Sequence, residues 1–292
     1  MAVSIEPKPT PAGDPVPNPA LGRELGDVAV RLSGVHFTYP LMGVSLRRKL
    51  TGALPVVGGQ LRQRKRRVEI QALEGIDLEL RQGQRLGILG HNGAGKSTLL
   101  RLIAGIYHPS AGSVEVFGRV AAVFDKMLGM DPEMTGYDNI RVRGMFLGLS
   151  NEEIEHRVEE IAEFCELGEY LHLPLRIYSP GMRARLGFST CTAFDADVLV
   201  LDEWMGVGDK RFRERAHERM KDFYERAGTV ILVSHNDQLI EENCDSAIVM
   251  EHGRVVDRYD LPTNAEPGAK PGYDFDEGGG ADFMTSDSMT EL

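Results

Sequence analysis

The sequence predicts an α/β domain in which a parallel sheet carries a phosphate-binding loop. Residues 90–97 read GHNGAGKS and match the pattern G-x-x-x-x-G-K-[ST] at every fixed position. The apolar runs 86–89, 198–201 and 229–233 have the composition of strands that are buried on both faces. Strands of this kind occur in parallel sheets covered by helices, as in an α/β core.

The phosphate-binding loop has the surroundings that its chemistry requires. The apolar run 86–89 precedes it, and an apolar pattern at helical spacing follows it over residues 99–103. The glycines allow successive backbone N–H groups to face an anion, and the start of the helix adds the positive end of its dipole. Lys96 is expected to reach the terminal phosphates, and Ser97 to bind Mg²⁺. The residues expected to bind nucleotide here are Gly90, Asn92, Gly93, Ala94, Gly95, Lys96, Ser97 and Thr98.

Two later strands end in residues that suit phosphate chemistry. Asp202 and Glu203 follow the run 198–201; Asp202 is expected to hold Mg²⁺, and Glu203 to orient or deprotonate a water molecule. The alternative for this pair is an acidic turn that is exposed to solvent. His235 follows the run 229–233 and, taken alone, is typical of a surface or capping residue. Residues 178–183 read YSPGMR, which by itself indicates a turn leading into a helix.

Taken together and in this order, the four elements resemble the ATP-binding subunits of ABC transporters over roughly residues 27–258. The resemblance implies a RecA-like P-loop NTPase core, an antiparallel β subdomain, and a smaller α-helical subdomain at about residues 126–185. It also implies ATP and Mg²⁺ as cofactors. Lys96, Glu203 and His235 match the catalytic positions of the family, with His235 sensing the γ-phosphate.

The resemblance places the second half of the site in another copy of the chain. In the ABC family two subunits pair head to tail, and the signature segment of one closes over the ATP bound by the other. The matching segment here is 178–182, where Ser179 and Gly181 remain as phosphate donors because Pro180 has no N–H. Asp209 matches the aspartate of the loop that crosses the dimer interface. A homodimer is therefore expected.

Departures from the general family pattern point to a subfamily. The family's glutamine that touches Mg²⁺ is missing, and Asp125 is the expected stand-in as a metal ligand. Residues 132–140, 147–150, 178–186 and 206–209 resemble those of subunits that export polysaccharides, O-antigens, capsules and teichoic acids. The resemblance implies a lipid-linked glycan as the substrate and an integral-membrane permease, on a separate chain, as the partner.

An insertion strengthens this subfamily resemblance. Tyr39, the expected adenine-stacking aromatic residue, lies about fifty residues before the phosphate loop, whereas the family usually places it about twenty-five residues before. The added residues 41–68 carry eight Lys or Arg residues and no acidic residue. Residues 45–54 predict a short basic amphipathic helix capped by Ser45. It resembles the gate helix of polysaccharide exporters and would suit an anionic membrane surface or the pyrophosphate of a lipid carrier. The alternative is a solvated basic loop.

Composition agrees with one such domain and with tails at both ends. The 292 residues, 42% hydrophobic, can bury one α/β core and a smaller helical lobe. Residues 1–26 are rich in proline and 259–292 are acidic, so both are expected to be disordered. No apolar run is long enough to span a bilayer, and the first twenty residues do not resemble a signal peptide. We therefore expect a peripheral protein at the cytoplasmic face of the inner membrane. Its cysteines have no metal-ligand spacing and read as reduced structural thiols: Cys165, Cys191 and Cys244.

Two other functions remain open at this point. The first is a non-transport ABC ATPase that acts on ribosomes or DNA, but the chain has one cassette and no heptad run. A net charge of −11 also argues against a nucleic-acid partner, so none is expected. The second is an ABC transporter subunit for a different substrate, which the basic insertion and the missing glutamine disfavour.

Overall fold

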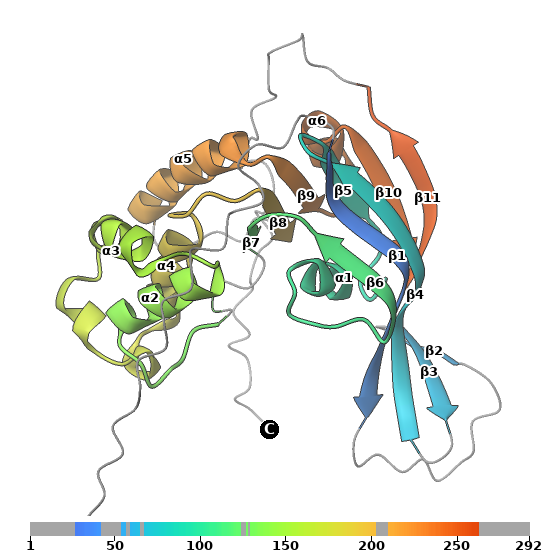
Figure 1. Ribbon diagram of the computed structural model, residues 1–292, viewed down its shortest axis with the longest axis horizontal. Helices are drawn as coiled ribbons and strands as arrows, with labels where there is room; N and C mark the ends of the chain where they lie inside the picture. The colour runs from blue at the N-terminus through green and yellow to red at the C-terminus, as the bar shows by residue number, and fades with distance from the viewer. Residues whose placement is uncertain are drawn as a thin grey trace, which may run out of the picture.

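The chain folds into two sheets and a group of helices, seen in the computed structural model of Figure 1. The structure describes residues 27–41, 54–56, 59–64, 67–123, 127, 129–202 and 210–262. Both predicted tails fall outside these ranges except for residues 259–262, and so do three expected site residues, Asp125, Glu203 and Asp209.

The larger sheet contains the three strands predicted from apolar runs. Its strand order is β11-β10-β5-β9-β8-β7, and all neighbours are parallel except β10 and β11. Every residue of β5 and β9 is buried, as expected for central strands covered on both faces. The strands are β5 (Arg85–Leu89), β7 (Val120–Ala122), β8 (Val198–Asp202), β9 (Thr229–Val233), β10 (Ser246–Glu251) and β11 (Arg254–Asp260).

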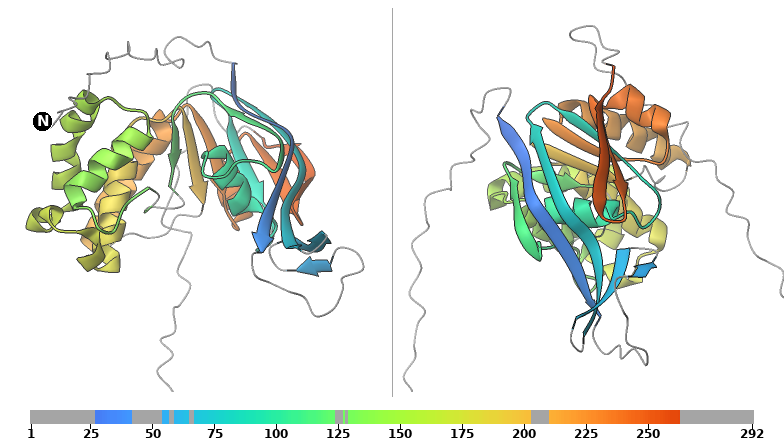
Figure 2. Two further views of the ribbon diagram at one scale, coloured as in Figure 1. Left: turned by 60° about the horizontal axis from the view of Figure 1, so that its bottom comes forward. Right: turned by 90° about the vertical axis from the view of Figure 1, so that its right-hand side faces the viewer.

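The second sheet is antiparallel and has the strand order β2-β3-β4-β1-β6. Its two longest strands, β1 and β4, form a ribbon that extends beyond the rest of the fold (Figures 1 and 2). The strands are β1 (Val28–Leu41), β2 (Leu54–Val56), β3 (Gly59–Arg64), β4 (Arg67–Arg81) and β6 (Ala111–Val116).

The antiparallel sheet corrects part of the prediction for residues 41–68. The predicted helix ends at Leu54, but Leu54 lies in β2 and pairs with Leu61 of β3. Strand β3 in turn pairs with β4, so this part of the insertion adds strands to the sheet edge. Residues 45–53, the remainder of the predicted helix, lie outside the described residues. Strands form at residues 54–56 and 59–64 because pairing with the long neighbouring strand β4, directly or through β3, satisfies their backbone N–H and C=O groups without a helix.

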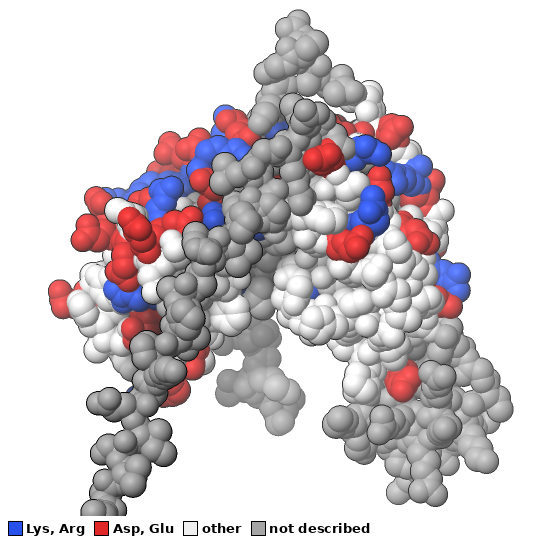
Figure 3. Space-filling model, in the orientation of Figure 1, with Lys and Arg blue, Asp and Glu red and all other residues white. Residues whose placement is uncertain are grey.

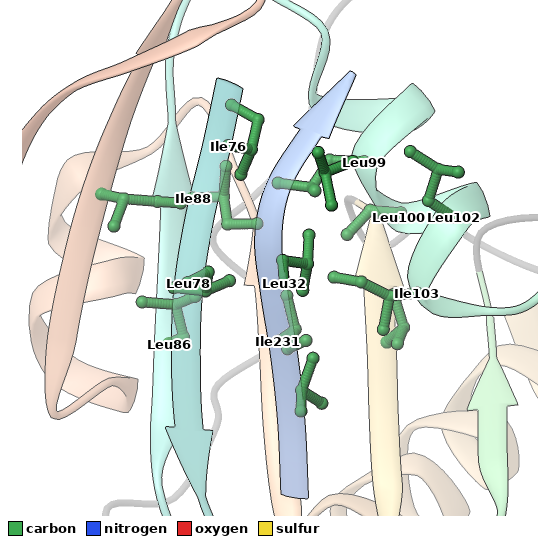
Figure 4. Close-up of a cluster of buried hydrophobic side chains, with 14 of the residues drawn as sticks. Leu32, Ile76, Leu78, Leu86, Ile88, Leu99, Leu100, Leu102, Ile103 and Ile231 are labelled. Atoms are coloured by element: carbon green, nitrogen blue, oxygen red, sulfur yellow. The ribbon is translucent and has the colours of Figure 1, made fainter. Parts of the chain in front are cut away.

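Helix α1 (Lys96–Ile103) lies between the two sheets (Figure 4). It shares a buried cluster with Leu32 and Ile76 of the antiparallel sheet and with Ile88 and Ile231 of the parallel sheet. Burial of each large apolar side chain stabilises this packing by roughly 1.5–3 kcal/mol. The helix that begins at the phosphate loop is therefore fixed from both sides; its buried apolar residues are Leu99, Leu100, Leu102 and Ile103.

The opposite face of the parallel sheet is covered by two helices. Side chains of α5 (Lys210–Arg226) and α6 (Asp237–Asn243) share a buried cluster with residues of β8 and β9. A separate helical lobe packs around its own core, as Figure 2 shows. The lobe contains α2 (Gly136–Phe146), α3 (Asn151–Cys165), the short helices η1 (Gly168–His172) and η2 (Leu175–Ile177), and α4 (Pro180–Cys191). Within the described residues, each helix is too short or too polar to cross a lipid bilayer.

Candidate nucleotide-binding site

The carboxyl ends of β5, β8 and β9 meet at one edge of the parallel sheet. Ligands of open α/β sheets bind in the crevice at this edge. A hollow of about 270 Å³ lies there, and it gathers residues that are far apart in the sequence. The phosphate loop supplies residues 91–98, and the ends of β8 and β9 supply Asp202 and His235. The structure thus brings together these predicted parts of the site.

Two glycines allow the phosphate loop to pack tightly against neighbouring strands. Gly90 has a φ of +142°, and a Cβ added there would lie 2.3 Å from the carbonyl oxygen of Met250. Gly95 has a φ of +107°, and its added Cβ would lie 2.8 Å from the carbonyl oxygen of Ala72. Both positions combine a left-handed backbone with contacts too short for a side chain. The glycines of the motif are therefore required by the fold as well as by phosphate binding.

A hairpin turn supports the loop from the other side. Strands β10 and β11 are joined through His252 and Gly253, whose φ values of 48° and 80° are those of a type I′ turn. The backbone N–H of Gly253 donates to the carbonyl oxygen of Ala94 at 2.8 Å, and its own carbonyl accepts from the N–H of Glu74, also at 2.8 Å. The turn thereby links the phosphate loop to β4.

The N-terminus of α1 faces the hollow without a competing side chain. Its N-cap, Gly95, makes no side-chain hydrogen bond, and the first turn contains no acidic residue. The first N–H groups of a helix have no acceptor within the helix, and the helix dipole makes this end positive. Phosphate oxygens are the ligands that such an end prefers. The local structure therefore fits the triphosphate of a nucleotide.

Lys96 is held in place by its own loop. Its side chain is only 7% exposed, and Nζ donates to the carbonyl oxygen of Gly90 and to that of His91, the latter at 3.3 Å. These contacts fold the ammonium group back over the loop. A single fixed positive charge at this point would stabilise negative charge on the terminal phosphates.

Ser97 and Asp202 form a pair of oxygen ligands across the site. The Ser97 hydroxyl donates to Oδ2 of Asp202 at 2.9 Å, although 105 residues separate them. Hydroxyl and carboxylate oxygens are the hard ligands that Mg²⁺ binds. The donor set and its position beside the phosphate loop fit the metal predicted from the sequence.

His235 lies just beyond β9 and lines the same hollow. The turn that carries it is ordered locally, because the Ser234 hydroxyl accepts from the backbone N–H of Asn236 at 3.0 Å. Asn236 in turn caps α6 through its side chain, which accepts from the N–H of Gln238 at 3.0 Å. The exposed His235 ring is thus placed at the carboxyl edge of the sheet, where the sequence predicted it.

Tyr39 reaches the phosphate-loop helix through its hydroxyl. This oxygen lies 3.1 Å from Oγ1 of Thr98, within hydrogen-bonding distance. The Tyr39 ring meets Phe37 edge-on at a centroid distance of 4.9 Å and Tyr107 at 5.9 Å. The sequence predicted Tyr39 but missed the two aromatic neighbours, because no motif or spacing marks them. His91 occupies a variable position of the loop motif, so no role was predicted for it. The centroid of its ring lies 5.2 Å from that of His252 in the β10–β11 turn.

Ser179 and Gly181 lie away from the phosphate loop of the same chain. They line a separate hollow on the helical lobe, at the start of α4. The Ser179 side chain caps this helix by accepting from the backbone N–H of Met182 at 3.2 Å, and Pro180 is its first residue. A turn leading into a helix, predicted for residues 178–183, is confirmed. One chain alone does not bring the two halves of the expected ATP site together.

Comparison with known proteins identifies the family. Residues 73–206 match the ABC transporter family. The O-antigen export system ATP-binding protein RfbE of Yersinia enterocolitica is 41% identical over 227 residues, which cover 76% of this chain and 94% of that protein. The chain belongs to the ABC transporter family, among its ATP-binding subunits. It is therefore a nucleotide-binding protein and an ATP hydrolase of the ABC type.

Other relatives extend the same similarity. The O-antigen export system ATP-binding protein RfbB of Myxococcus xanthus is 42% identical over 64% of this chain, which spans 43% of that protein. The teichoic acids export ATP-binding protein TagH of Lactococcus lactis is 39% identical over 63% of this chain and 39% of that protein. The chain thus spans less than half the length of these two relatives.

A solved structure confirms the predicted fold class. The ATP-binding cassette MJ0796, in a dimeric structure bound to ADP and phosphate, superposes with a TM-score of 0.56 at 20% identity. The matched region covers 80% of this chain and 99% of that one. The ABC subunit thus has the P-loop ATPase fold expected from its sequence.

Proposed function

We propose that this chain is the ATP-hydrolysing subunit of an ABC exporter that moves a lipid-linked polysaccharide across the cytoplasmic membrane. The observation that carries the proposal is the 41% identity to an O-antigen export subunit, extending over 94% of that protein. Similarity to a teichoic acids export subunit supports the same substrate class. The two relatives are named for the export of O-antigen and of teichoic acids, so a polymer of this class is the substrate that the chain's similarity favours.

Each site residue is assigned a separate role in binding or hydrolysing ATP. Lys96 and the N-terminus of α1 bind and orient the phosphates, and His235 contacts the γ-phosphate from the end of β9. Ser97 and Asp202 would hold Mg²⁺, which when bound neutralises negative charge on the phosphate oxygens. Glu203, the residue after Asp202, orients the attacking water.

A head-to-tail homodimer completes the site. Ser179 and Gly181 line a hollow on the helical lobe, separate from the hollow at the phosphate loop. In the proposed dimer these two donors close over ATP bound by the second copy, and Asp209 lies at the interface. Closure on ATP and opening after hydrolysis would drive an integral-membrane permease on another chain, with this subunit bound peripherally at the cytoplasmic face.

Glu203→Gln tests the proposed chemistry. The amide keeps the size of the side chain but is no base, so ATP binding should persist while hydrolysis falls by about a thousandfold or more. The variant should accumulate as an ATP-bound dimer, measured by light scattering after size-exclusion chromatography. Lys96→Ala is the matched control, because it should lose nucleotide binding and stay monomeric. Near-normal turnover by Glu203→Gln would remove Glu203 from this role.

A further inference from the structure

The side chain of Arg183 fixes the backbone beside the signature segment, residues 178–182, through two hydrogen bonds. Its Nε donates to the carbonyl oxygen of Tyr178 at 3.1 Å, and its Nη2 donates to that of Arg176 at 3.2 Å. Tyr178 directly precedes Ser179, the N-cap of α4. One guanidinium group on the first turns of α4 therefore fixes the path of the chain as it enters the helix.

Tyr178 holds the same segment from the inside of the lobe. Its ring is 3% exposed, and its hydroxyl donates to the carbonyl oxygen of Tyr170 in η1. Burial raises the pKa of this hydroxyl to about 12, so it remains a neutral donor at physiological pH. A Cβ added to Gly136, the first residue of α2, would lie 2.6 Å from the Tyr178 hydroxyl oxygen. Tyr178 is thus packed closely between η1 and the start of α2.

The contacts of Arg183 and Tyr178 matter because the signature segment has few hydrogen-bond donors for phosphate. Pro180 has no N–H, and the N–H of Met182 already donates to the Ser179 side chain at 3.2 Å. The Gly181 amide and the Ser179 hydroxyl proton remain. Binding groups must be held within about 0.5 Å of their productive positions, which requires supporting side chains that are themselves locked. Because only two donors remain, a shift of the backbone at the start of α4 would displace both of them from the partner's ATP.

We propose that Arg183 and Tyr178 are positioning residues that hold Ser179 and Gly181 in the geometry that closes over the partner's ATP. The inference rests on the proposed head-to-tail dimer and adds the residues that prepare one half of it. Neither side chain touches the nucleotide. Their effect should therefore appear in ATP-driven dimerisation, and not in the binding of ATP by the phosphate loop of a single chain.

The experiment measures the ATP concentration that gives half-maximal dimerisation in the Glu203→Gln background. Arg183→Lys keeps the charge but loses the two separate nitrogens, Nε and Nη2, that bond the two carbonyls, so the midpoint should rise about tenfold. Tyr178→Phe removes only the hydroxyl and should raise it about threefold or more. ATP binding by each monomer should be unchanged. Arg176→Lys is the matched control and should leave the midpoint unchanged. The exposed Arg176 side chain pairs with Glu133 and does not bond residues 178–182.

Three results would overturn the inference. If Glu203→Gln dimerises on ATP and neither Arg183→Lys nor Tyr178→Phe shifts the midpoint, the positioning role is wrong and the proposed dimer stands. A lower melting temperature with an unshifted midpoint would likewise make both residues purely structural. If Glu203→Gln itself does not dimerise on ATP, the proposed dimer and the inference both fail. Should Tyr178→Phe not fold, Arg183→Lys alone decides the question.

Discussion

Ser97 and Asp202 show how local motifs and long-range packing combine in this site. Each lies at the end of a motif that the sequence reveals, but only the parallel arrangement of β5, β9 and β8 brings their oxygens within 2.9 Å. Because both side chains offer hard oxygen ligands, the loss of either should affect the metal-dependent part of nucleotide binding more than the phosphate contacts of the loop.

Ser97→Ala tests this separation. The loop amides and Lys96 remain, so ATP affinity in the presence of EDTA should change little. The gain in affinity on adding Mg²⁺ should fall by about tenfold or more, because one metal ligand and the hydrogen bond to Asp202 are lost. Titration with a fluorescent ATP analogue measures both quantities. Ser113→Ala, at an exposed position of β6, is the control. An unchanged Mg²⁺ gain would remove Ser97 from the metal site.

The role of Tyr39 can be tested by comparing ATP with inorganic tripolyphosphate. If its ring contacts adenine, Tyr39→Ala should weaken ATP binding by about tenfold and leave tripolyphosphate binding unchanged. Tyr39→Phe keeps the ring and loses only the contact with Thr98, so its ATP affinity should stay close to that of the unmodified chain. Isothermal titration measures both ligands. An equal loss for both would mean that Tyr39 supports the loop by packing against Phe37 and Tyr107.

Among the helices and strands, those predicted correctly are the ones whose burial leaves a pattern in the local sequence. The buried strands β5, β8 and β9 and the helix after the phosphate loop follow from runs of apolar residues and a glycine motif. The strands β2 and β3 were missed because they depend on pairing with β4, a contact that short apolar runs do not reveal. The aromatic neighbours of Tyr39 were missed because no motif or spacing marks Phe37 and Tyr107.

Helix α3 begins with a capping box whose stability depends on pH. Ser150 accepts from the N–H of Glu153, and the Glu153 carboxylate accepts from the backbone N–H and hydroxyl of Ser150. These hydrogen bonds from Ser150 lower the pKa of Glu153 below its usual value. The folded pKa is therefore below the unfolded one, so the stabilisation is fully present above the unfolded pKa and is lost as the pH falls through the folded pKa.

Ser150→Ala should lower the free energy of unfolding by about 1 kcal/mol near neutral pH. Glu153→Gln should remove the acid-dependent part of the stability, so that its difference from the unmodified chain shrinks as the pH falls below the usual range of a glutamate. Urea unfolding at several pH values measures both. Glu152→Gln, in the same helical turn but outside the capping box, is the control. An identical pH dependence for the two glutamine variants would contradict this assignment.

At the scale of the whole molecule, charge is distributed unevenly along the chain. On the face shown in Figure 3, Lys and Arg side chains stand among Asp and Glu, with no single sign dominating the described residues. The sequence from 41 to 68, by contrast, carries eight basic residues and no acidic one, in a chain of net charge −11. Such a segment is suited to an anionic surface or to the pyrophosphate of a lipid carrier.

Neutralising Arg47, Arg48 and Lys49 to Gln should separate hydrolysis from export. ATPase activity in detergent should be preserved, because the phosphate loop and its partners are unchanged, while glycan export by cells should fall several-fold as the attraction to anionic lipid is lost. Surface glycan is measured by immunoblotting. The control removes three charges from the exposed face of α5, by replacing Arg211, Arg213 and Lys221 with Gln. Equal loss of ATPase activity and export would instead indicate a role in folding.

If this ATPase drives a polysaccharide exporter, it should bind a permease at the membrane. The full chain is affinity-purified from gently solubilised membranes of its native host, and the bound proteins are identified by mass spectrometry. We expect a multi-spanning permease encoded beside glycosyltransferases, bound in amounts similar to those of the chain. Ribosomal or DNA-repair proteins without a membrane partner would contradict the export function and leave only the ATPase.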